Sequence, residues 1–318
     1  MNLVLVEHEA GIIAGASLEA LSFARGLGAP VHGVAFGEGG ASALEAAGAH
    51  GAVAGTHVTI DGGYAAAAWA QAIADLAAAA APAAVVAAGT DRGNELLAHL
   101  GAKASAPFVA NCIAAEQGAD GWSLTRQRWG GSLLEDAIVR RPLVLLSVAL
   151  HAVTPEPAPA AAEFEVDEVA PVVAPEDLSA RATRVETAAA GARSLGGAPL
   201  VVGGGRGVGS AEGFATLDVF AAALDGVVGV SRAVTSAGWR PHAQQIGQTG
   251  ERIGADLYIA CGISGASQHM VGCRGAKKLL AINTDPDAPI LARADYAVIG
   301  DLHQVVPAIL AELQRRRG

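Results

Sequence analysis

A short stretch of the chain changes character abruptly and ends in groups that can bind a ligand. Residues 257–272 read LYIACGISGASQHMVG. The first four residues are apolar, with β-branched and aromatic members, and predict a buried strand. The glycines that follow let the backbone approach a ligand closely, and a helix is expected to start at Ser267. Because a helix start offers free N–H groups and a partial positive charge, a phosphate is the expected occupant.

A glycine-rich segment, VVGGGRGVGS at residues 201–210, ends another apolar run. It fits the dinucleotide pattern G-x-G-x-x-G in no register, and no Gly-Lys-Ser/Thr follows, so it is not a P-loop. A tight turn with close packing remains an alternative interpretation. Arg206 within the glycines favours a phosphate or the edge of a flavin, because a guanidinium presents several donors in one plane.

A third segment, AGWRPHAQQIGQTG at residues 237–250, has no helix or strand period. We expect an ordered loop whose amides, hydroxyl and backbone N–H groups face a ligand. Taken alone, the segment is more typical of a surface loop. Likewise, a single histidine such as His269 is more often structural than functional, and only its place beside the expected cleft argues for a role.

The second half of the chain explains how these segments meet. Five apolar runs each end in polar or glycine residues: PLVVGGGRG, VVGVSRAV, LYIACGISG, LLAINTDP and YAVIGDL. A half-buried helix is expected between the first two, from apolar residues spaced three and four apart. In an open parallel sheet all carboxyl ends lie at one edge, where ligands bind. The polar ends should therefore converge on one cleft: Arg206; Ser231 and Arg232; Ser264; Asn283 and Asp285; Asp301.

The first half also alternates apolar runs with helical patterns, which predicts βαβ units and a mostly parallel sheet. The segment around WSLTRQRWGG, residues 122–131, favours antiparallel additions. Residues 151–187 are rich in proline and acidic residues and indicate a connector with one edge strand, EFEVDEV, at residues 163–169. The sequence thus predicts an α/β protein with two Rossmann-like domains, residues 1–187 and 188–318.

Composition narrows the class of protein. The 318 residues are 52% hydrophobic and 16% charged, enough for two buried cores, and the net charge of -10 argues against a nucleic-acid partner. The Ala-rich stretch near residues 65–88 reads as a helix and a strand, so no membrane insertion is expected. The first apolar run is interrupted by Glu7, His8 and Glu9, which is not the pattern of a signal peptide. Three cysteines without a CxxC pair favour a reducing, cytoplasmic setting. No metal site is expected.

Six segments in order resemble one family: GGGRG, GVSRAV, QIGQTG, LYIACGISGASQHMVG, AINTDPDAPI and ADYAVIGDL. Over residues 198–312 they are similar to the FAD domain of the electron-transfer flavoprotein α subunit, with fitting intervals between the segments. The first half resembles the amino-terminal domain of that family more loosely, in its opening strand and in GTDRGNELLAHLGAK. The resemblance implies one FAD in residues 188–318 and a β subunit docked against the chain, forming a heterodimer.

The resemblance also assigns roles to residues. Arg206 would contact the adenosine-diphosphate half of FAD, and Ser231 and Arg232 would approach the flavin. The isoalloxazine would be lined by Gln245, Ile246, Gly247, Gln248 and Thr249, with Thr249 near its reactive edge. The phosphates and the pyrimidine end would be held by Ser264, Gly265, Ala266, Ser267, Gln268 and His269. Asn283 and Asp301 would bind the adenosine end.

The residues themselves show no general acid/base pair and no nucleophile beside a base, so no catalytic residue is expected. An electron carrier needs neither, because its substrate is the flavin of another protein. We therefore expect a carrier that takes electrons from dehydrogenases and passes them to an acceptor oxidoreductase. A single-chain FAD- or NAD(P)-dependent oxidoreductase and a nucleotide-binding regulatory module without redox chemistry are the alternatives.

Overall fold

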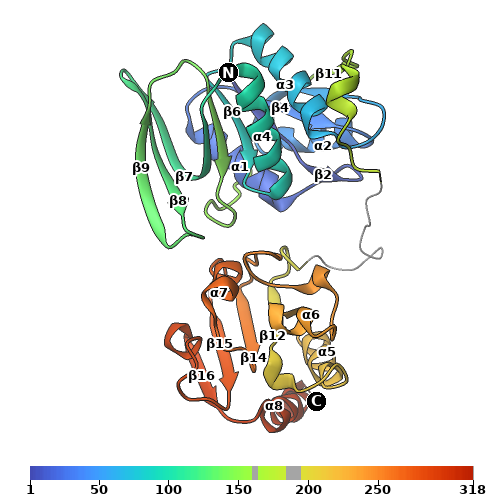
Figure 1. Ribbon diagram of the computed structural model, residues 1–318, viewed down its shortest axis with the longest axis vertical. Coiled ribbons are helices and arrows are strands. Elements are labelled where there is room, and N and C mark those ends of the chain that lie inside the picture. Colours follow the sequence, from blue (N-terminus) through green and yellow to red (C-terminus); the bar gives the residue numbers. More distant parts are fainter. Residues whose placement is uncertain (160–163, 184–194, 318) are drawn as a thin grey trace. The chain divides into compact units, whose positions relative to one another are not determined.

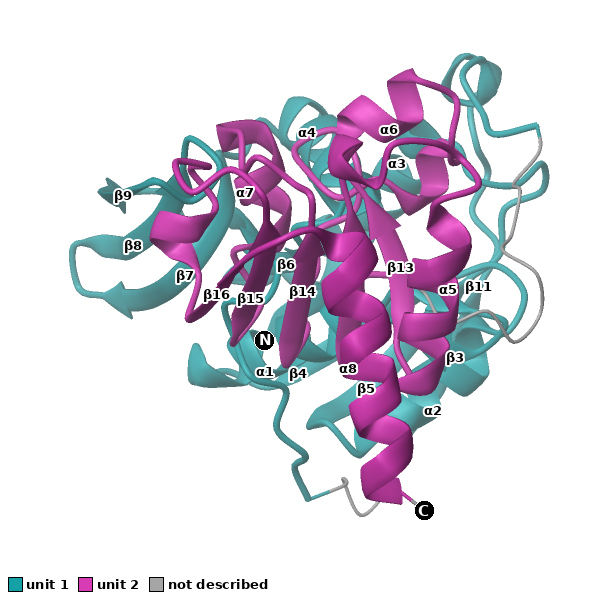
Figure 2. Cartoon of the chain, turned by 90° about the horizontal axis from the view of Figure 1, so that it is seen from below, with its two compact units in different colours: residues 1–186 teal, residues 187–318 magenta. Residues whose placement is uncertain are grey.

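The chain divides into two compact units, residues 1–186 and 187–318 (Figure 2). The computed structural model describes residues 1–159, 164–183 and 195–317. The boundary expected near residue 187 lies among residues 184–194, outside the described residues. Both units are α/β, with sheets that are mostly parallel, which confirms the predicted fold class.

The first unit is built on a nine-stranded sheet with the order β11-β5-β4-β1-β6-β10-β7-β8-β9 (Figure 1). Its parallel part consists of β1 (Asn2–Leu5), β4 (Val31–Phe36), β5 (Ala52–Val58), β6 (Ala84–Ala88), β10 (Val144–Val148) and β11 (Val166–Val169). Four of these strands, β1, β4, β6 and β10, are buried over nearly their whole length, as expected where helices cover both faces of a parallel sheet. A small hairpin, β2 (His8–Glu9) with β3 (Ile12–Ile13), follows β1.

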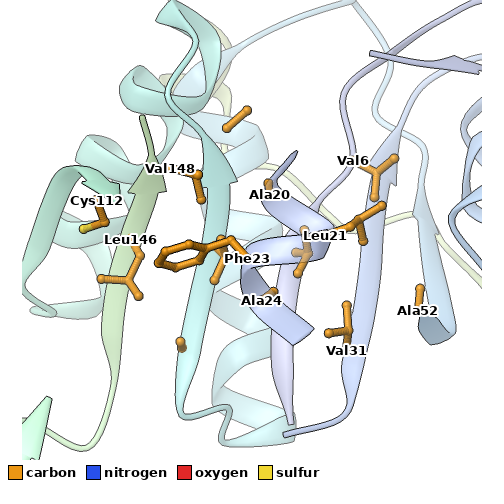
Figure 3. Close-up of a cluster of buried hydrophobic side chains, with 14 of the residues drawn as sticks. Val6, Ala20, Leu21, Phe23, Ala24, Val31, Ala52, Cys112, Leu146 and Val148 are labelled. Atoms are coloured by element: carbon orange, nitrogen blue, oxygen red, sulfur yellow. The ribbon is translucent and has the colours of Figure 1, made fainter. Parts of the chain in front are cut away.

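Two helices pack on each face of this sheet. One hydrophobic cluster joins α1 (Gly15–Gly26) and α2 (Gly40–Gly48) to the strands, and another joins α3 (Ala66–Ala80) and α4 (Asp91–Ala104) to the opposite face. Within the first cluster, the ring of Phe23 on α1 points toward Leu146 and Val148 of β10 (Figure 3). Ala20, Leu21 and Ala24 of α1 are buried in the same cluster, and the small side chains of the two alanines let the helix approach the sheet.

The predicted additions to the sheet are confirmed. The strands β7 (Phe108–Gly118), β8 (Gly121–Arg128) and β9 (Leu133–Val139) are paired antiparallel to one another, and β7 joins β10 in parallel. The expected edge strand in the connector is β11, which pairs with β5 at the other end of the sheet. Its predicted first residue, Glu163, lies outside the described residues. A 3-10 turn, η1 (Pro175–Leu178), follows, where Asp177 forms an ion pair with Lys103.

The second unit has a five-stranded parallel sheet with the order β13-β12-β14-β15-β16, made of the five strands that the sequence predicts. They are β12 (Leu200–Gly204), β13 (Val227–Val230), β14 (Leu257–Cys261), β15 (Leu279–Asn283) and β16 (Tyr296–Ile299). Around them lie α5 (Phe214–Ala223), α6 (Arg232–Ser236), α7 (Ser267–Cys273) and α8 (Leu302–Arg317). Short 3-10 turns complete the unit: η2 (Arg206–Val208), η3 (His242–Gln244) and η4 (Leu291–Arg293).

The strand order reverses at β12. The chain passes from β12 to β13 on one side and then returns to β14 on the other side. In an open α/β sheet a ligand crevice forms outside the carboxyl ends of the strands at such a point. Along the described residues, no helix is long and apolar enough to cross a membrane. The cysteines Cys112, Cys261 and Cys273 are free and buried.

A buried carboxyl group fixes the start of the connector to α1. Glu19 is 7% exposed, and its carboxylate accepts the backbone N–H of His151 at 2.8 Å. The N–H groups of Ala152 and Val153 also stabilise the charged form, but burial outweighs them and raises the pKa of Glu19 to about 7.

This shift predicts how stability depends on pH. Since the pKa in the folded state lies above the unfolded value, the stabilising contribution is complete below about pH 4.5 and is lost as the pH rises to about 7. Glu19→Gln should remove this decline, which amounts to at most about 3 kcal/mol in the free energy of unfolding. Denaturant unfolding at several pH values, followed by tryptophan fluorescence, measures it. Glu45→Gln, on the exposed side of α2, is the matched control. A decline of equal slope in Glu19→Gln would contradict the assignment.

Candidate functional site

A cavity of about 710 Å³ opens at the carboxyl ends of β12, β13, β14 and β15, within the second unit. Its size lies inside the range of about 300–1,000 Å³ that is usual for ligand sites. The predicted site residues that line it are Arg206, Ser231, Arg232, Gln245, Ile246, Gly247, Gln248, Thr249, Ser264, Ala266, Gln268, His269 and Asn283. The structure thus brings together polar strand ends that are far apart in sequence.

Three predicted site residues are not part of the lining, and the structure gives each another role. Gly265 has a φ of +84°, and a side chain there would meet Ile290 rather than the cavity. Asp301 accepts the backbone N–H of His303 at 2.9 Å, at the start of α8. Ser267 is exposed at the start of α7. Direct contact of these three residues with the ligand stays a prediction.

The lining also contains residues to which the resemblance assigns no cofactor contact, although two of them, Gly262 and Asp285, are expected near the ligand from the sequence. They are Gly207, Ala233, Ser236, Gly262, Ile263, Asp285 and Ala288. Gly262 and Asp285 stand at strand ends, where the pattern of polar ends already marks them. Ala233 and Ser236 on α6, and Ala288 after β15, have no distinguishing chemistry, so only the fold shows their position.

The glycine-rich segment owes its composition to close packing. The register pairs Gly204 of β12 with Cys261 of β14, so the chain leaves both strands side by side. A side chain on Gly205 would come within 2.1 Å of the Gly262 carbonyl oxygen, and one on Gly207 within 2.7 Å of the Gly262 Cα. The backbones of the two loops therefore touch, and they form part of the wall of the cavity. The alternative interpretation of this segment, a tight turn with close packing, accounts for these glycines.

The segment QIGQTG is an ordered loop held by backbone hydrogen bonds. Ile246 N donates to the carbonyl of Val230 at 2.8 Å, and Gln248 N donates to the carbonyl of Gln268 at 2.8 Å. The loop also closes on itself, because Glu251 N donates to the carbonyl of Gln245 at 2.7 Å. These bonds join the loop to the end of β13 and to α7, and they fix its position on the cavity.

Side chains in this wall form a polar chain. Thr235 Oγ1 lies 2.7 Å from Gln245 Oε1 and 3.0 Å from the Arg232 carbonyl oxygen. Gln245 Nε2 donates to Thr249 Oγ1 at 2.9 Å, and Arg232 Nη1 lies 3.5 Å from the same hydroxyl. Because Gln245 is only 2% exposed, its amide has little freedom to choose other partners.

Two cations border the cavity without local neutralisation. Arg206 and Arg232 are both exposed, and neither forms an ion pair with a carboxylate in the described part of the chain. Asp285 is the only acidic residue in the lining, and its carboxylate accepts the backbone N–H of Asp287 at 3.0 Å. The site therefore presents positive charge, which suits an anionic ligand such as a diphosphate.

His269 is neutral, and its ring is held by a hydrogen bond to a buried tyrosine. Its Nε2 lies 2.8 Å from the hydroxyl oxygen of Tyr258. Burial lowers the pKa of His269 to about 4, although the nearby carbonyl of Ile246 favours the charged form. The side chain of Asn283 is also fixed by hydrogen bonds to the backbone. Its Nδ2 donates to the Ile263 carbonyl at 2.9 Å, and its Oδ1 accepts the Asp285 N–H at 3.1 Å.

These residues fit a dinucleotide that carries a diphosphate and a polar ring. Bare backbone at Gly207, Gly247 and Gly262 permits close approach, and the two guanidinium groups supply charge. His269 Nδ1 is buried and has no hydrogen-bond partner of good geometry among the described residues, although the Ile246 carbonyl lies near the ring. The ionisable groups of the lining are two arginines, one aspartate and one neutral histidine.

Comparisons with known proteins agree with this site. A family model described as the electron transfer flavoprotein FAD-binding domain matches residues 194–274, and one described as the electron transfer flavoprotein domain matches residues 2–174. The chain is 36% identical to the electron transfer flavoprotein subunit alpha of Mycobacterium leprae over 322 residues, covering 99% of each chain. The protein of the same name from Mycobacterium tuberculosis is 37% identical, again over 99% of each chain. That from Bacillus subtilis is 34% identical over 71% of this chain and 69% of its own length.

Near-complete coverage at this identity, two matching family models and a cavity suited to a dinucleotide lead to one conclusion: the chain belongs to the electron transfer flavoprotein α-subunit family, and its carboxyl-terminal domain is the one that binds FAD.

Proposed function

We propose that the chain is the α subunit of a heterodimer that accepts electrons from flavin dehydrogenases through FAD in its second unit and passes them to an acceptor oxidoreductase. One observation carries the proposal. The cavity at the strand ends is bordered by two exposed arginines that form no ion pair among the described residues, as expected of a site that holds an anionic redox cofactor. Bound FAD supplies the chemistry, which is the reversible uptake of electrons.

The geometry supports a division of the cavity into two ends. Arg206, on the turn after β12, would bind the diphosphate half, with Asn283 shaping the adenosine end through the loop that it holds. Arg232, Thr249 and the loop at residues 245–249 would line the isoalloxazine. Ser264 and Gln268 would bind between these ends. Gly265 would shape the bend beside the phosphates, and Ser267 and Asp301 would contact the cofactor as the sequence predicts.

The residues near the ring would act by hydrogen bonding and charge. A flavin becomes more negative when it is reduced, and a neighbouring cation stabilises that state. Arg232 is always charged, and its exposed guanidinium lies beside the hydroxyl of Thr249. His269, being neutral, would contribute a hydrogen bond rather than a charge. The polarity of this wall would therefore set the reduction potential.

The partner and the setting are further parts of the proposal. A cleft made of strand ends in one small unit leaves one side of the cofactor accessible, which a carrier needs to reach the flavin of a donor. A β subunit docked on the chain would supply the remaining wall. The three cysteines are buried and form no disulfide, which supports a cytoplasmic setting. The proposal concerns electron transfer and includes neither NADH oxidation nor bifurcation.

Gly265 provides a test of how the cavity is supported. Gly265→Ala places a methyl group against Ile290, at about the 2.6 Å given for an added Cβ, and should displace Ser264 and Ala266 and weaken FAD binding. Gly209→Ala is the matched control, because its φ of +87° is similar but nothing lies within 4 Å of the added carbon. Flavin absorbance after gel filtration measures occupancy, and Trp239 fluorescence reports the fold of this unit. Equal occupancy in the two variants would contradict the supporting role of Gly265.

Arg232 provides a test of the electrostatics. Arg232→Ala should lower the reduction potential of the flavin by tens of mV, since the reduced ring loses a compensating charge that solvent partly screens. Redox titration of the FAD-loaded heterodimer measures the shift. Arg315→Ala removes the same charge from α8, outside the cavity, and should leave the potential unchanged. An unaltered potential in Arg232→Ala, with FAD retained, would place Arg232 away from the ring.

The partnership itself can be measured. Co-expression with a β subunit should give a stable heterodimer with one FAD in the α chain, reducible by a flavin dehydrogenase and its substrate. The interface is expected to exceed about 2,000 Å², the size usual for permanent complexes. Sedimentation and a flavin count test this. A flavin-saturated monomer that accepts electrons unaided would favour a single-chain oxidoreductase, whereas a colourless heterodimer would favour a regulatory nucleotide-binding module.

A further inference from the structure

Tyr258 stands behind the cavity, at a place where the sequence gives no hint of function. It is the second residue of β14, is completely buried, and its hydroxyl oxygen lies 2.8 Å from Nε2 of His269. The two rings have centroids 6.0 Å apart and planes tilted by 37°, so the contact is a hydrogen bond at the ring edges rather than a stack.

Space for the hydroxyl is provided by the glycine-rich segment. A Cβ added to Gly203 would fall 2.2 Å from the Tyr258 hydroxyl oxygen. Gly203 is therefore needed for a different reason from Gly205 and Gly207, which face the backbone of Gly262. One strand, β12, thus leaves room for a tyrosine side chain on the neighbouring strand, and this side chain reaches the histidine on α7.

The direction of the hydrogen bond follows from burial. No other described residue forms a hydrogen bond with the Tyr258 hydroxyl. If His269 Nε2 carried the proton and donated it, the hydroxyl proton would remain buried without an acceptor, which is unfavourable. The hydroxyl must therefore donate to Nε2, and in a neutral imidazole the other nitrogen, Nδ1, then carries the proton.

Both groups keep these protonation states near neutral pH. Burial raises the pKa of Tyr258 well above its ordinary value, so the hydroxyl keeps its proton. Burial also lowers the pKa of His269 to about 4, so the imidazole remains neutral. His269 lines the cavity, and its Nδ1 has no partner within hydrogen-bonding geometry in the described residues.

We propose that Tyr258 is a positioning residue that locks His269 in the tautomer with the proton on Nδ1, so that the cavity is offered a hydrogen-bond donor at this point. The inference rests on the proposed function for the meaning of that donor, which would face the pyrimidine end of the flavin. The tautomer itself is a property of this chain and can be measured with or without the cofactor.

The test is nitrogen NMR of the full chain in its complex, with ¹⁵N-labelled histidine in the α chain only. His269→Gln identifies the His269 signals among those of the nine histidines. In the unaltered protein His269 should show a protonated Nδ1 and an unprotonated Nε2. Tyr258→Phe keeps the ring and removes the hydroxyl, so a substantial second species with a protonated Nε2 should appear, and the flavin potential should fall.

Two further variants sharpen the result. Gly203→Ala keeps the tyrosine but displaces its hydroxyl, and should shift the tautomer in the same direction as Tyr258→Phe. Tyr296→Phe is the matched control, because this tyrosine of β16 is 62% exposed and outside the lining; it should change neither the His269 signals nor the potential.

The outcomes separate this inference from the proposed function. A protonated Nε2 in the unaltered protein, or an unchanged nitrogen pattern in Tyr258→Phe, would overturn the role of Tyr258. The first of these readings is made on the unaltered protein and needs only His269→Gln for assignment, so it decides the matter even where Tyr258→Phe or Gly203→Ala prevents folding. Absence of flavin from the unaltered complex would overturn the proposed function, while the histidine signals of that same sample would still decide the tautomer.

Discussion

The second unit depends on the contact between two glycine backbones. Where the strand order reverses, the chain leaves β12 through Gly205 and β14 through Gly262. The backbones of these two loops are so close that no side chain fits between them. Any side chain at Gly205 would collide with a carbonyl group and push the two strand ends apart. The polar residues that follow both strands converge because this contact is possible. The cavity therefore depends on the absence of side chains at Gly205 and Gly262 as much as on the side chains that line it.

Charge in the cavity is arranged by a division between buried and exposed groups. The buried members, Gln245, His269 and Asn283, are neutral and hydrogen-bonded to neighbouring parts of the unit. The two arginines are exposed, where water reduces the cost of an unpaired charge. The exposed arginines can therefore attract an anionic cofactor, while the buried residues of the cavity are neutral, so no isolated charge is buried.

The sequence predicted most of the fold and much of the site, for a physical reason. The carboxyl ends of strands can be predicted from the sequence, because a buried apolar run stops where polar residues begin. In a parallel sheet these ends all lie at one edge. This logic placed Arg206, Ser231 and Asn283 at the cavity. It does not reveal the local contacts of Gly265 and Asp301, which lie against Ile290 and at the start of α8 because of their backbone geometry. Tyr258 was read as part of a buried strand, and its bond to His269 depends on the distance between β14 and α7, which no local pattern records.

The hydroxyl of Thr235 has one proton and two acceptors within reach, the Arg232 carbonyl at 3.0 Å and Gln245 Oε1 at 2.7 Å. It cannot donate to both at once. If the proton turns to the carbonyl, the amide of Gln245 can rotate by half a turn so that its NH₂ group faces Thr235 and its oxygen faces Thr249. The Thr249 hydroxyl would then direct its proton at Gln245 and its lone pairs elsewhere. Donor and acceptor at this wall can thus exchange places through one hydroxyl and one amide, with every heavy atom staying close to its present position.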